Sequence, residues 1–276
     1  MLRRYVFLLV ALGAPGAARA HHEAIFGPQS SLVLSAPAFV SLQCFTRRWG
    51  QPALQETTAV VSAGVSPFRF PLSFTAIAPA SYLQAPSGSR SGVEDLILGA
   101  RYRFDFDELR RVWGKEGNFA MVMGSAELPT GMIDHPAFEG PLDYMGALLA
   151  SLEKAAFSGI LYSFGRYNGP SHGGKKPGDN LFFGSGFAWT PLDEAEGRLL
   201  SFQLGTSLEL YAQEVVEGGA VSGTGGHALL FHPTVVWGPG HRLLTFVVAS
   251  LPAVDSRPPA QAERFRLGGG VVYLFD

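Results

Sequence analysis

Residues 200–211 read LSFQLGTSLELY, and this stretch shows most directly how the chain folds. Its even-numbered positions hold leucine, phenylalanine and threonine, whereas its odd-numbered positions include serine, glycine, Gln203 and Glu209. Successive side chains of a β-strand point to opposite faces, so a period of two predicts a strand with one apolar and one polar face. We therefore expect this segment to separate two different environments.

The same alternation recurs along the chain. In residues 96–106 the polar face holds Arg101 and Arg103, and in residues 265–275 it holds Arg266 and two glycines. About twelve segments of roughly ten residues have strand character, which predicts an all-β fold. Alternation alone would also fit a soluble β-sandwich with one solvent-exposed face. The lengths of the connections between strands therefore have to distinguish a sandwich from a barrel.

Long polar connections alternate with shorter ones. Shorter connections fall near residues 66–67, 153–154, 191–197 and 238–240. The long connections fall at residues 47–55, 84–93, 128–143, 167–180, 213–226 and 252–263. Long loops on one side and short turns on the other are typical of an antiparallel up-and-down β-barrel in the outer membrane. The charged connection at 107–117 is long for the periplasmic side and departs from this rhythm.

The first twenty residues have the pattern of a secretory signal peptide. Arg3 and Arg4 precede an apolar run at residues 5–12, and small residues end at Ala20, where we expect cleavage. We expect two regions, a signal peptide at 1–20 and an outer-membrane barrel at 21–276. No later run reaches the roughly 18 apolar residues that a membrane-spanning helix needs.

Composition fits a wall that faces lipid. Charged residues make up 16% of the chain, below the roughly one quarter that is usual for soluble domains. The formal net charge is −2, without the clustered basic face that nucleic-acid binding requires. We expect the partners to be outer-membrane lipid, a small-molecule solute and the barrel-assembly machinery, because the alternating aromatic strand that ends at Phe275 is typical of barrels that this machinery inserts. Asp276, one residue beyond, departs from the usual aromatic terminus.

Five polar side chains are candidates to line the lumen, because alternation places them on the inward face. They either fill the interior by pairing with one another or set the charge selectivity of a pore. The five are Arg101, Arg103, Gln203, Glu209 and Arg266.

Two other constellations carry alternative chemistry. Cleavage after Ala20 would leave His21 and His22 at the N-terminus, where an α-amine and an imidazole could bind copper together, giving a metal-linked barrel. Ser171 and His172 supply the residue types of an outer-membrane lipid-modifying enzyme. Proline and glycines around them predict a flexible loop that would hold a nucleophile and base poorly, so we expect neither an enzyme nor a cofactor.

Short motifs resemble a bacterial outer-membrane family labelled for the meta-pathway of phenol degradation and described as transporter-like. They lie at residues 26–31 (FGPQSS), 94–104 (EDLILGARYRF), 128–131 (LPTG) and 178–182 (GDNLF). The resemblance implies an outer-membrane barrel of about twelve strands that passes small organic compounds. The expected function is a passive, porin-like channel or uptake protein for small molecules, including hydrophobic or aromatic ones.

Overall fold

The computed structural model describes most of the chain from Ala38 onward, and the structural statements below concern only this part. The described residues are 38–50, 54–67, 71–86, 88–105, 119–131, 143–154, 156–169, 175–192, 198–239, 242–259 and 261–275. The predicted signal peptide and the metal and enzyme candidates His21, His22, Ser171 and His172 lie outside them.

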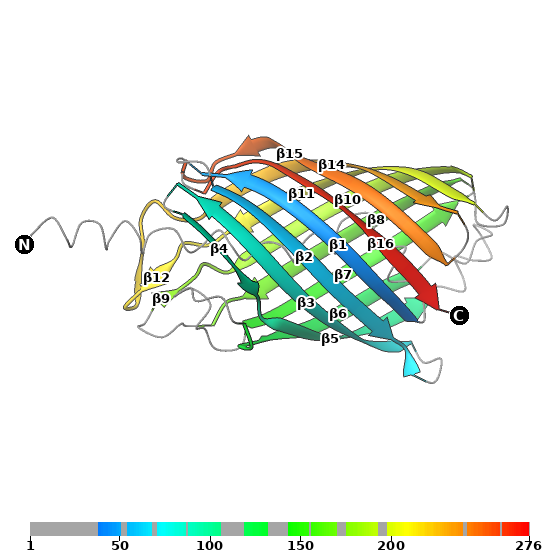
Figure 1. Cartoon of the computed structure of the whole chain (residues 1–276), viewed down its shortest axis with the longest axis horizontal. Coiled ribbons are helices and arrows are strands. Elements are labelled where there is room, and N and C mark those ends of the chain that lie inside the picture. The colour runs from blue at the N-terminus through cyan, green and yellow to red at the C-terminus, as the bar shows by residue number, and fades with distance from the viewer. Residues whose placement is uncertain are drawn as a thin grey trace, which may run out of the picture.

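Twelve antiparallel strands form the wall of a closed barrel, which confirms the all-β prediction (Figure 1). Their bounds are β1 Ala38–Trp49, β2 Leu54–Val65, β3 Leu72–Ala85, β5 Leu96–Asp105, β6 Phe119–Leu128, β7 Asp143–Lys154, β8 Phe157–Tyr167, β10 Asn180–Leu192, β11 Leu199–Tyr211, β14 Gly226–Gly238, β15 Leu243–Asp255 and β16 Glu263–Phe275. Four further strands are not part of this ring: β4 Gly88–Val93, which pairs with β3, and β9 Lys175–Lys176, β12 Val215–Val216 and β13 Gly219–Ala220, which form a separate small sheet.

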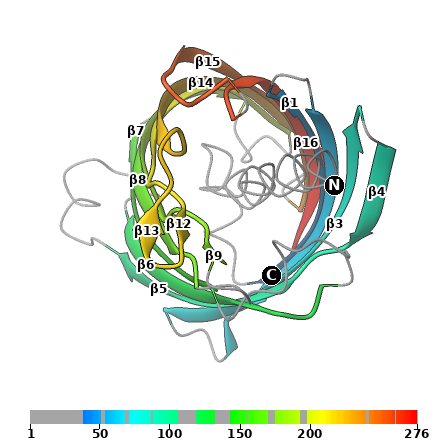
Figure 2. The ribbon, with the colours of Figure 1, turned by 90° about the vertical axis from the view of Figure 1, so that its left-hand side faces the viewer.

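Pairing of the first and last strands closes the cylinder. β1 pairs with β2 on one side and with β16 on the other, from Ala38 opposite Phe275 to Arg48 opposite Phe265. Each remaining wall strand pairs with two neighbours, so the ring has no free edge along its main length (Figure 2). Closure satisfies backbone groups that could find no water partner in a bilayer.

β3 changes its partner strand near the end of the barrel that carries the longer loops. β3 pairs with β5 over its first half and with β4 over its second half. Pro79 lies at the change of partner, where its missing N–H removes a ladder hydrogen bond, and its carbonyl accepts the backbone N–H of Glu94 at 2.9 Å. Beyond this point β4 stands outside the ring (Figure 2).

The predicted alternation of long and short connections is largely confirmed. The end of the barrel that holds Trp49 also holds the connections after β6, β8, β11 and β15, and Phe275 lies at the other end (Figure 1). Two predicted long loops were wrong. Residues 47–55 are mostly strand, because β1 and β2 pair as far as Trp49 and Leu54, and residues 84–93 fold as the β3–β4 hairpin. The connection at 107–117 lies outside the described residues.

Acidic residues ahead of two strands fasten the neighbouring loops. Asp95 accepts the backbone N–H of Gly131 at 2.7 Å, and Thr130 accepts that of Leu96 at 3.0 Å, so the motifs at 94–104 and 128–131 bind each other. Asp179 likewise accepts the backbone N–H of Asn168 at 2.9 Å. In both places the acidic residue therefore joins the start of a strand to the loop beyond the end of a neighbouring strand.

Gly178, beside Asp179, packs against a neighbouring loop. A Cβ at this position would collide with the backbone carbonyl of Ala212. The backbone N–H of Ala212 in turn donates to the carbonyl of Asp179 at 2.8 Å. Glycine is required here because two backbones approach closely.

The outward face of the barrel is apolar. Large exposed side chains such as Leu161, Phe187 and Val247 cover the outside, whereas the side chains between them are buried in the interior. A soluble protein would show the reverse distribution, and an apolar band around a closed barrel is typical of a membrane-spanning wall. None of the described residues forms a helix long and apolar enough to span a bilayer.

Candidate functional site

The structure places all five candidate lumen residues on the inward, buried face of the wall. Arg101 and Arg103 lie on β5, Gln203 and Glu209 on β11, and Arg266 on β16. The side chains beside them in sequence, such as Tyr102, Leu204 and Leu267, are exposed on the outside. In these three strands the predicted inward residues are thus less exposed than their neighbours, and their role in lining a lumen stays a prediction.

Two of these candidates meet across the interior. The Arg266 guanidinium donates to both carboxylate oxygens of Glu209, with nitrogen–oxygen distances of 3.2 and 3.0 Å. β14 and β15 lie between their two strands in the wall, so this paired contact bridges over both. Paired hydrogen bonds between a guanidinium and a carboxylate combine charge with fixed geometry.

Arg266 belongs to a larger ion-pair network near the long-loop end. It also donates to Glu263, at 2.5 and 2.8 Å. Arg257 contacts Glu263 at 3.6 Å and binds Asp255 at 2.6 Å. On the adjoining strands, Arg47 and Glu56 form a buried pair at 2.7 Å. The interior charges on this side are thus held by specific partners.

Arg257 lies in the connection between β15 and β16, outside the wall strands. Burial alone would lower the pKa of its guanidinium. Hydrogen bonds to Asp255, together with attraction to Tyr211 and Glu263, outweigh that effect and hold the pKa above its ordinary value. The residue therefore stays charged and ties the outer end of β15 to β16 through Asp255, which also accepts the backbone N–H of Glu263 at 2.8 Å.

A second charged cluster lies on the opposite side of the barrel. Arg166 on β8 binds Glu127 on β6 and lies 2.8 Å from Asp143 on β7. β7 stands six strands from β16 in a ring of twelve, so this Arg166 triad faces the Arg266 network across the interior. Asp143 also accepts the backbone N–H of Gly169 at 2.8 Å, which joins the triad to the loop after β8.

Sequence analysis missed the Arg166 triad although a signal was present. Asp143 was assigned to the end of a predicted long loop at 128–143, whereas the structure makes it the first residue of β7 and pairs it directly with Glu127, near the end of β6. The missed signal lies in residues 157–167. There Ile160, Phe164 and Arg166 share one face, which would have placed Arg166 inward.

The remaining predicted residues have different surroundings. Arg101 donates to Ser73 at 2.5 Å and lies over the ring of Phe39, and Arg103 lies 4.3 Å from the ring centre of Phe119. Gln203 donates to Ser201 at 3.5 Å. Among the five candidates, Glu209 and Arg266 are thus a pair in direct contact.

Hydroxyl groups and one histidine line another part of the interior. The two ring nitrogens of His232 lie 2.8 Å from the hydroxyls of Ser207 and Ser250, on the strands at either side. On β1 and β2, farther along the wall, Ser41 and Ser62 are hydrogen-bonded at 2.6 Å. Such side chains give the interior a neutral polar surface between the charged clusters.

Aromatic rings form a row along β8, β10 and β11. Phe164 stacks on Phe182 with ring centres 5.6 Å apart, and Phe182 meets the edge of Tyr211 at 5.7 Å. Arg257 lies 4.9 Å from the ring centre of Tyr211, which links the row to the Arg266 network. This aromatic row belongs to an apolar cluster that includes Phe45, on β1.

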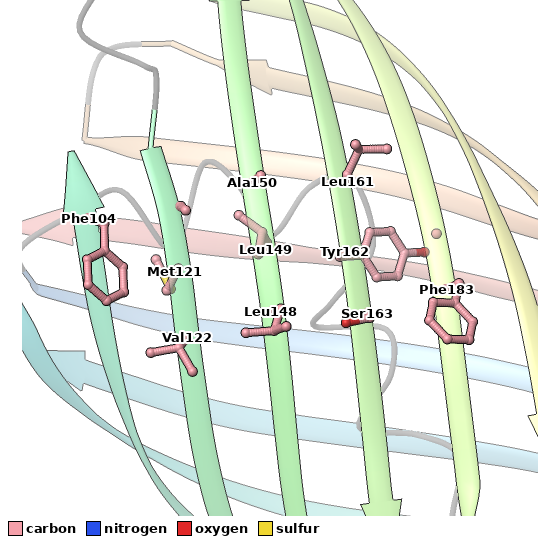
Figure 3. A pocket seen from close by; sticks show the side chains of 12 residues that line it. Phe104, Met121, Val122, Leu148, Leu149, Ala150, Leu161, Tyr162, Ser163 and Phe183 are labelled. Atoms are coloured by element: carbon pink, nitrogen blue, oxygen red, sulfur yellow. The ribbon is translucent and has the colours of Figure 1, made fainter. Parts of the chain in front are cut away.

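A shallow hollow of about 610 Å³ lies on the outside of the wall (Figure 3). Its floor holds the small outward side chains of Ala150 and Ser163, and Phe104, Leu148 and Phe183 stand around them. These five residues are on the lipid-facing side of their strands, whereas Met121, Leu149 and Tyr162, which also line the hollow, belong to an inward apolar cluster. The hollow therefore opens mainly toward lipid.

The metal alternative receives no support from the described residues. No group of three histidine, cysteine or carboxylate side chains that could hold a metal ion occurs among them. Cys44, the only cysteine of the chain, is exposed on the outward face of β1. The copper prediction for His21 and His22 falls outside the described part of the chain and stays a prediction.

Comparison with known proteins identifies the fold. No family model and no curated protein sequence matches the chain. An outer-membrane channel from Pseudomonas putida F1 matches with a TM-score of 0.64 and 14% identity, over 86% of this chain and 94% of that one. The NanC porin matches with a TM-score of 0.53 and 8% identity, over 86% of this chain and all of that one (100%).

A third match is the translocator domain of the autotransporter NalP from Neisseria meningitidis, with a TM-score of 0.50, 13% identity, and coverage of 95% of this chain and 99% of that one. At these identities the likeness concerns the fold, which is that of outer-membrane β-barrels. Together with the apolar outward wall, it places this chain in an outer membrane. The more specific resemblance to the phenol-pathway family stays a prediction.

Proposed function

We propose that this protein is a passive outer-membrane channel or uptake protein for small molecules, including hydrophobic and aromatic ones. The observation that carries the proposal is the lining of the barrel, which combines the aromatic row with hydroxyl groups and paired charges. A path lined by both aromatic and polar groups lowers the free-energy barrier to crossing for a solute that has both an apolar and a polar part.

The arrangement of charge supports passive passage. The inward arginines of the two clusters bind carboxylates directly, so the charges largely balance one another at close range. A small neutral solute then meets no strong electrostatic barrier, while a large ion would have to compete with existing pairs. Fold likeness to a channel and to a porin agrees with this function, and the resemblance to the phenol-pathway family favours organic solutes.

Conductance and uptake measurements test the proposal. The purified protein is placed in planar bilayers, and in liposomes with phenol as a neutral aromatic solute and glycerol as a neutral solute of similar mass. We expect measurable current and faster phenol uptake than in protein-free liposomes. If both the full-length protein and a form shortened before β1 gave no current and no uptake, the channel function would be rejected.

A further inference from the structure

A β-bulge in β16 changes the direction of one arginine at the long-loop end of the barrel. Phe265 lies opposite Arg48 on β1. The next pair is Glu263 opposite Trp49, so Arg264 has no partner residue of its own on β1. A bulge of this kind inserts one extra residue into a strand and re-aims a side chain. Strict alternation from Phe265 would have turned Arg264 toward the interior.

The bulge instead brings two arginines to the outward face. Glu263 and Arg266 are the inward residues on either side, since they bind each other inside the barrel. Arg264 is exposed between them, and Arg48 is exposed next to the buried Arg47. Because β1 and β16 run side by side, the two exposed side chains leave the wall from neighbouring strands on the same outward surface (Figure 1).

The carboxylates in this part of the wall are bound to other arginines. The pairs are Glu56 with Arg47, Glu263 with Arg266, and Asp255 with Arg257. In the described part of the chain, no ion pair includes Arg48 or Arg264. The outward face therefore carries two positive charges that no acidic side chain of this part neutralises.

The two arginines stand at the border of the apolar band. Leu267, three residues after Arg264 on β16, is 50% exposed on the outward face, and Val271 farther along the same strand is exposed as well. The neighbour of Arg48 in register on β2 is Gln55, which is exposed and uncharged. Both arginines thus lie at the level of lipid head groups, at the end that faces the outside of the cell in barrels of this kind.

We propose that Arg48 and Arg264 together bind the phosphate group of a lipid in the outer leaflet, whose chains lie along the apolar wall beside Leu267. A guanidinium presents its N–H groups in a planar fork that matches the oxygens of a phosphate. Two guanidinium groups also match the charge of a phosphate monoester. The site lies on the outside of the barrel, so it does not depend on the proposed channel function.

Cys44 provides a place for a reporter of such a lipid. It is exposed on the outward face of β1, four residues from Arg48, and it is the only cysteine of the chain. Four residues of a strand span about 13 Å. A lipid chain that extends from a phosphate at Arg48 therefore passes Cys44 partway along its length.

Fluorescence quenching tests the proposal. The full-length protein is labelled at Cys44 with bimane and placed in phosphatidylcholine vesicles. These contain a small fraction of a lipid with a nitroxide in the middle of one chain, which is either phosphatidic acid or phosphatidylcholine at equal amounts. We expect the phosphatidic acid to quench at least threefold more efficiently than the phosphatidylcholine. Equal quenching by the two lipids in this parent protein would overturn the proposal, and this comparison does not depend on any variant folding.

Variants test whether the two arginines cause the preference. Arg48→Gln and Arg264→Gln should each reduce the preference by at least half, and the double variant should show none. Arg198→Gln is the matched control, because Arg198 is an exposed arginine directly before β11, at the other end of the barrel, and it should keep the full preference. Quenching by the nitroxide phosphatidylcholine should be the same in all of them, as expected for folded barrels with Cys44 in lipid.

Two results would contradict the assignment. A preference that survives in the double variant would show that other groups attract the lipid. Loss of the preference in the parent protein on addition of millimolar inorganic phosphate would show that the two arginines bind the free ion instead of a lipid. We expect inorganic phosphate to have little effect, because the lipid is also held by its chains.

Discussion

Replacing Arg166 by methionine should destabilise the barrel by about 3–5 kcal/mol, the usual effect of removing one partner from a buried ion pair. The Arg166 side chain is 2% exposed, and those of Glu127 and Asp143 are 7% and 5% exposed. Methionine keeps much of the side-chain volume but leaves two buried carboxylates side by side with no cation between them. Because two ion pairs are lost at once, we expect a value in the upper half of that range.

Equilibrium unfolding in urea, followed by tryptophan fluorescence of the protein in lipid vesicles, measures this change. Arg198→Met is the matched control, because Arg198 is an exposed arginine directly before β11, and it should change stability by less than about 0.5 kcal/mol. Adding Glu127→Gln and Asp143→Asn to Arg166→Met removes the uncompensated charges and should recover most of the loss. A loss below about 1 kcal/mol for Arg166→Met, or no recovery in the triple variant, would refute the argument that the triad is a buried, mutually dependent unit.

Three further predictions concern the loops and the outer face. Gly178→Ala should destabilise the barrel by about 1–3 kcal/mol in urea unfolding, since its Cβ meets a backbone carbonyl, while Gly146→Ala, whose nearest neighbour is 3.8 Å away, should be nearly neutral; equal effects would contradict the close approach. Cys44 should react in liposomes at least tenfold faster with a lipid-soluble maleimide than with a charged one, and the reverse order would place it away from lipid. Asp95→Ala should free the backbone N–H of Gly131 and speed its hydrogen exchange, with a stability loss of about 1 kcal/mol; unchanged exchange would show that this hydrogen bond does not hold the loop.

The sequence was sufficient to predict the strands because the barrel gives each of them two unlike faces. A period of two is readable wherever outward side chains are apolar and inward ones are polar, as in β5, β11 and β16. It fails where both faces are apolar, and in β7 only Asp143 and the residues near Lys154 depart from an apolar or small run. At Pro79 the partner of β3 changes from β5 to β4. This change could not be predicted, because the sequence of one strand does not show which strands pair with it.

The interior contacts were predictable only in part, for a similar reason. Alternation placed Arg266 and Glu209 on the inward face, but their pairing depends on the curvature of a wall with two strands between them. Arg166 and Asp143 are joined by register, which is set by turn lengths and by the pairing of β7 with β8. Sequence thus indicates which residues point inward, and three-dimensional closure decides which of them meet.

Closure of the cylinder is the claim on which the rest depends, and amide hydrogen exchange of the protein in lipid vesicles tests it most directly. β1 and β16 pair along nearly their full length, so their amides should exchange as slowly as those of β11, which has a partner strand on each side. An open sheet would leave one edge of β1 and one edge of β16 unpaired. Rapid exchange of alternate amides in either strand, with β11 still protected, would contradict a closed barrel.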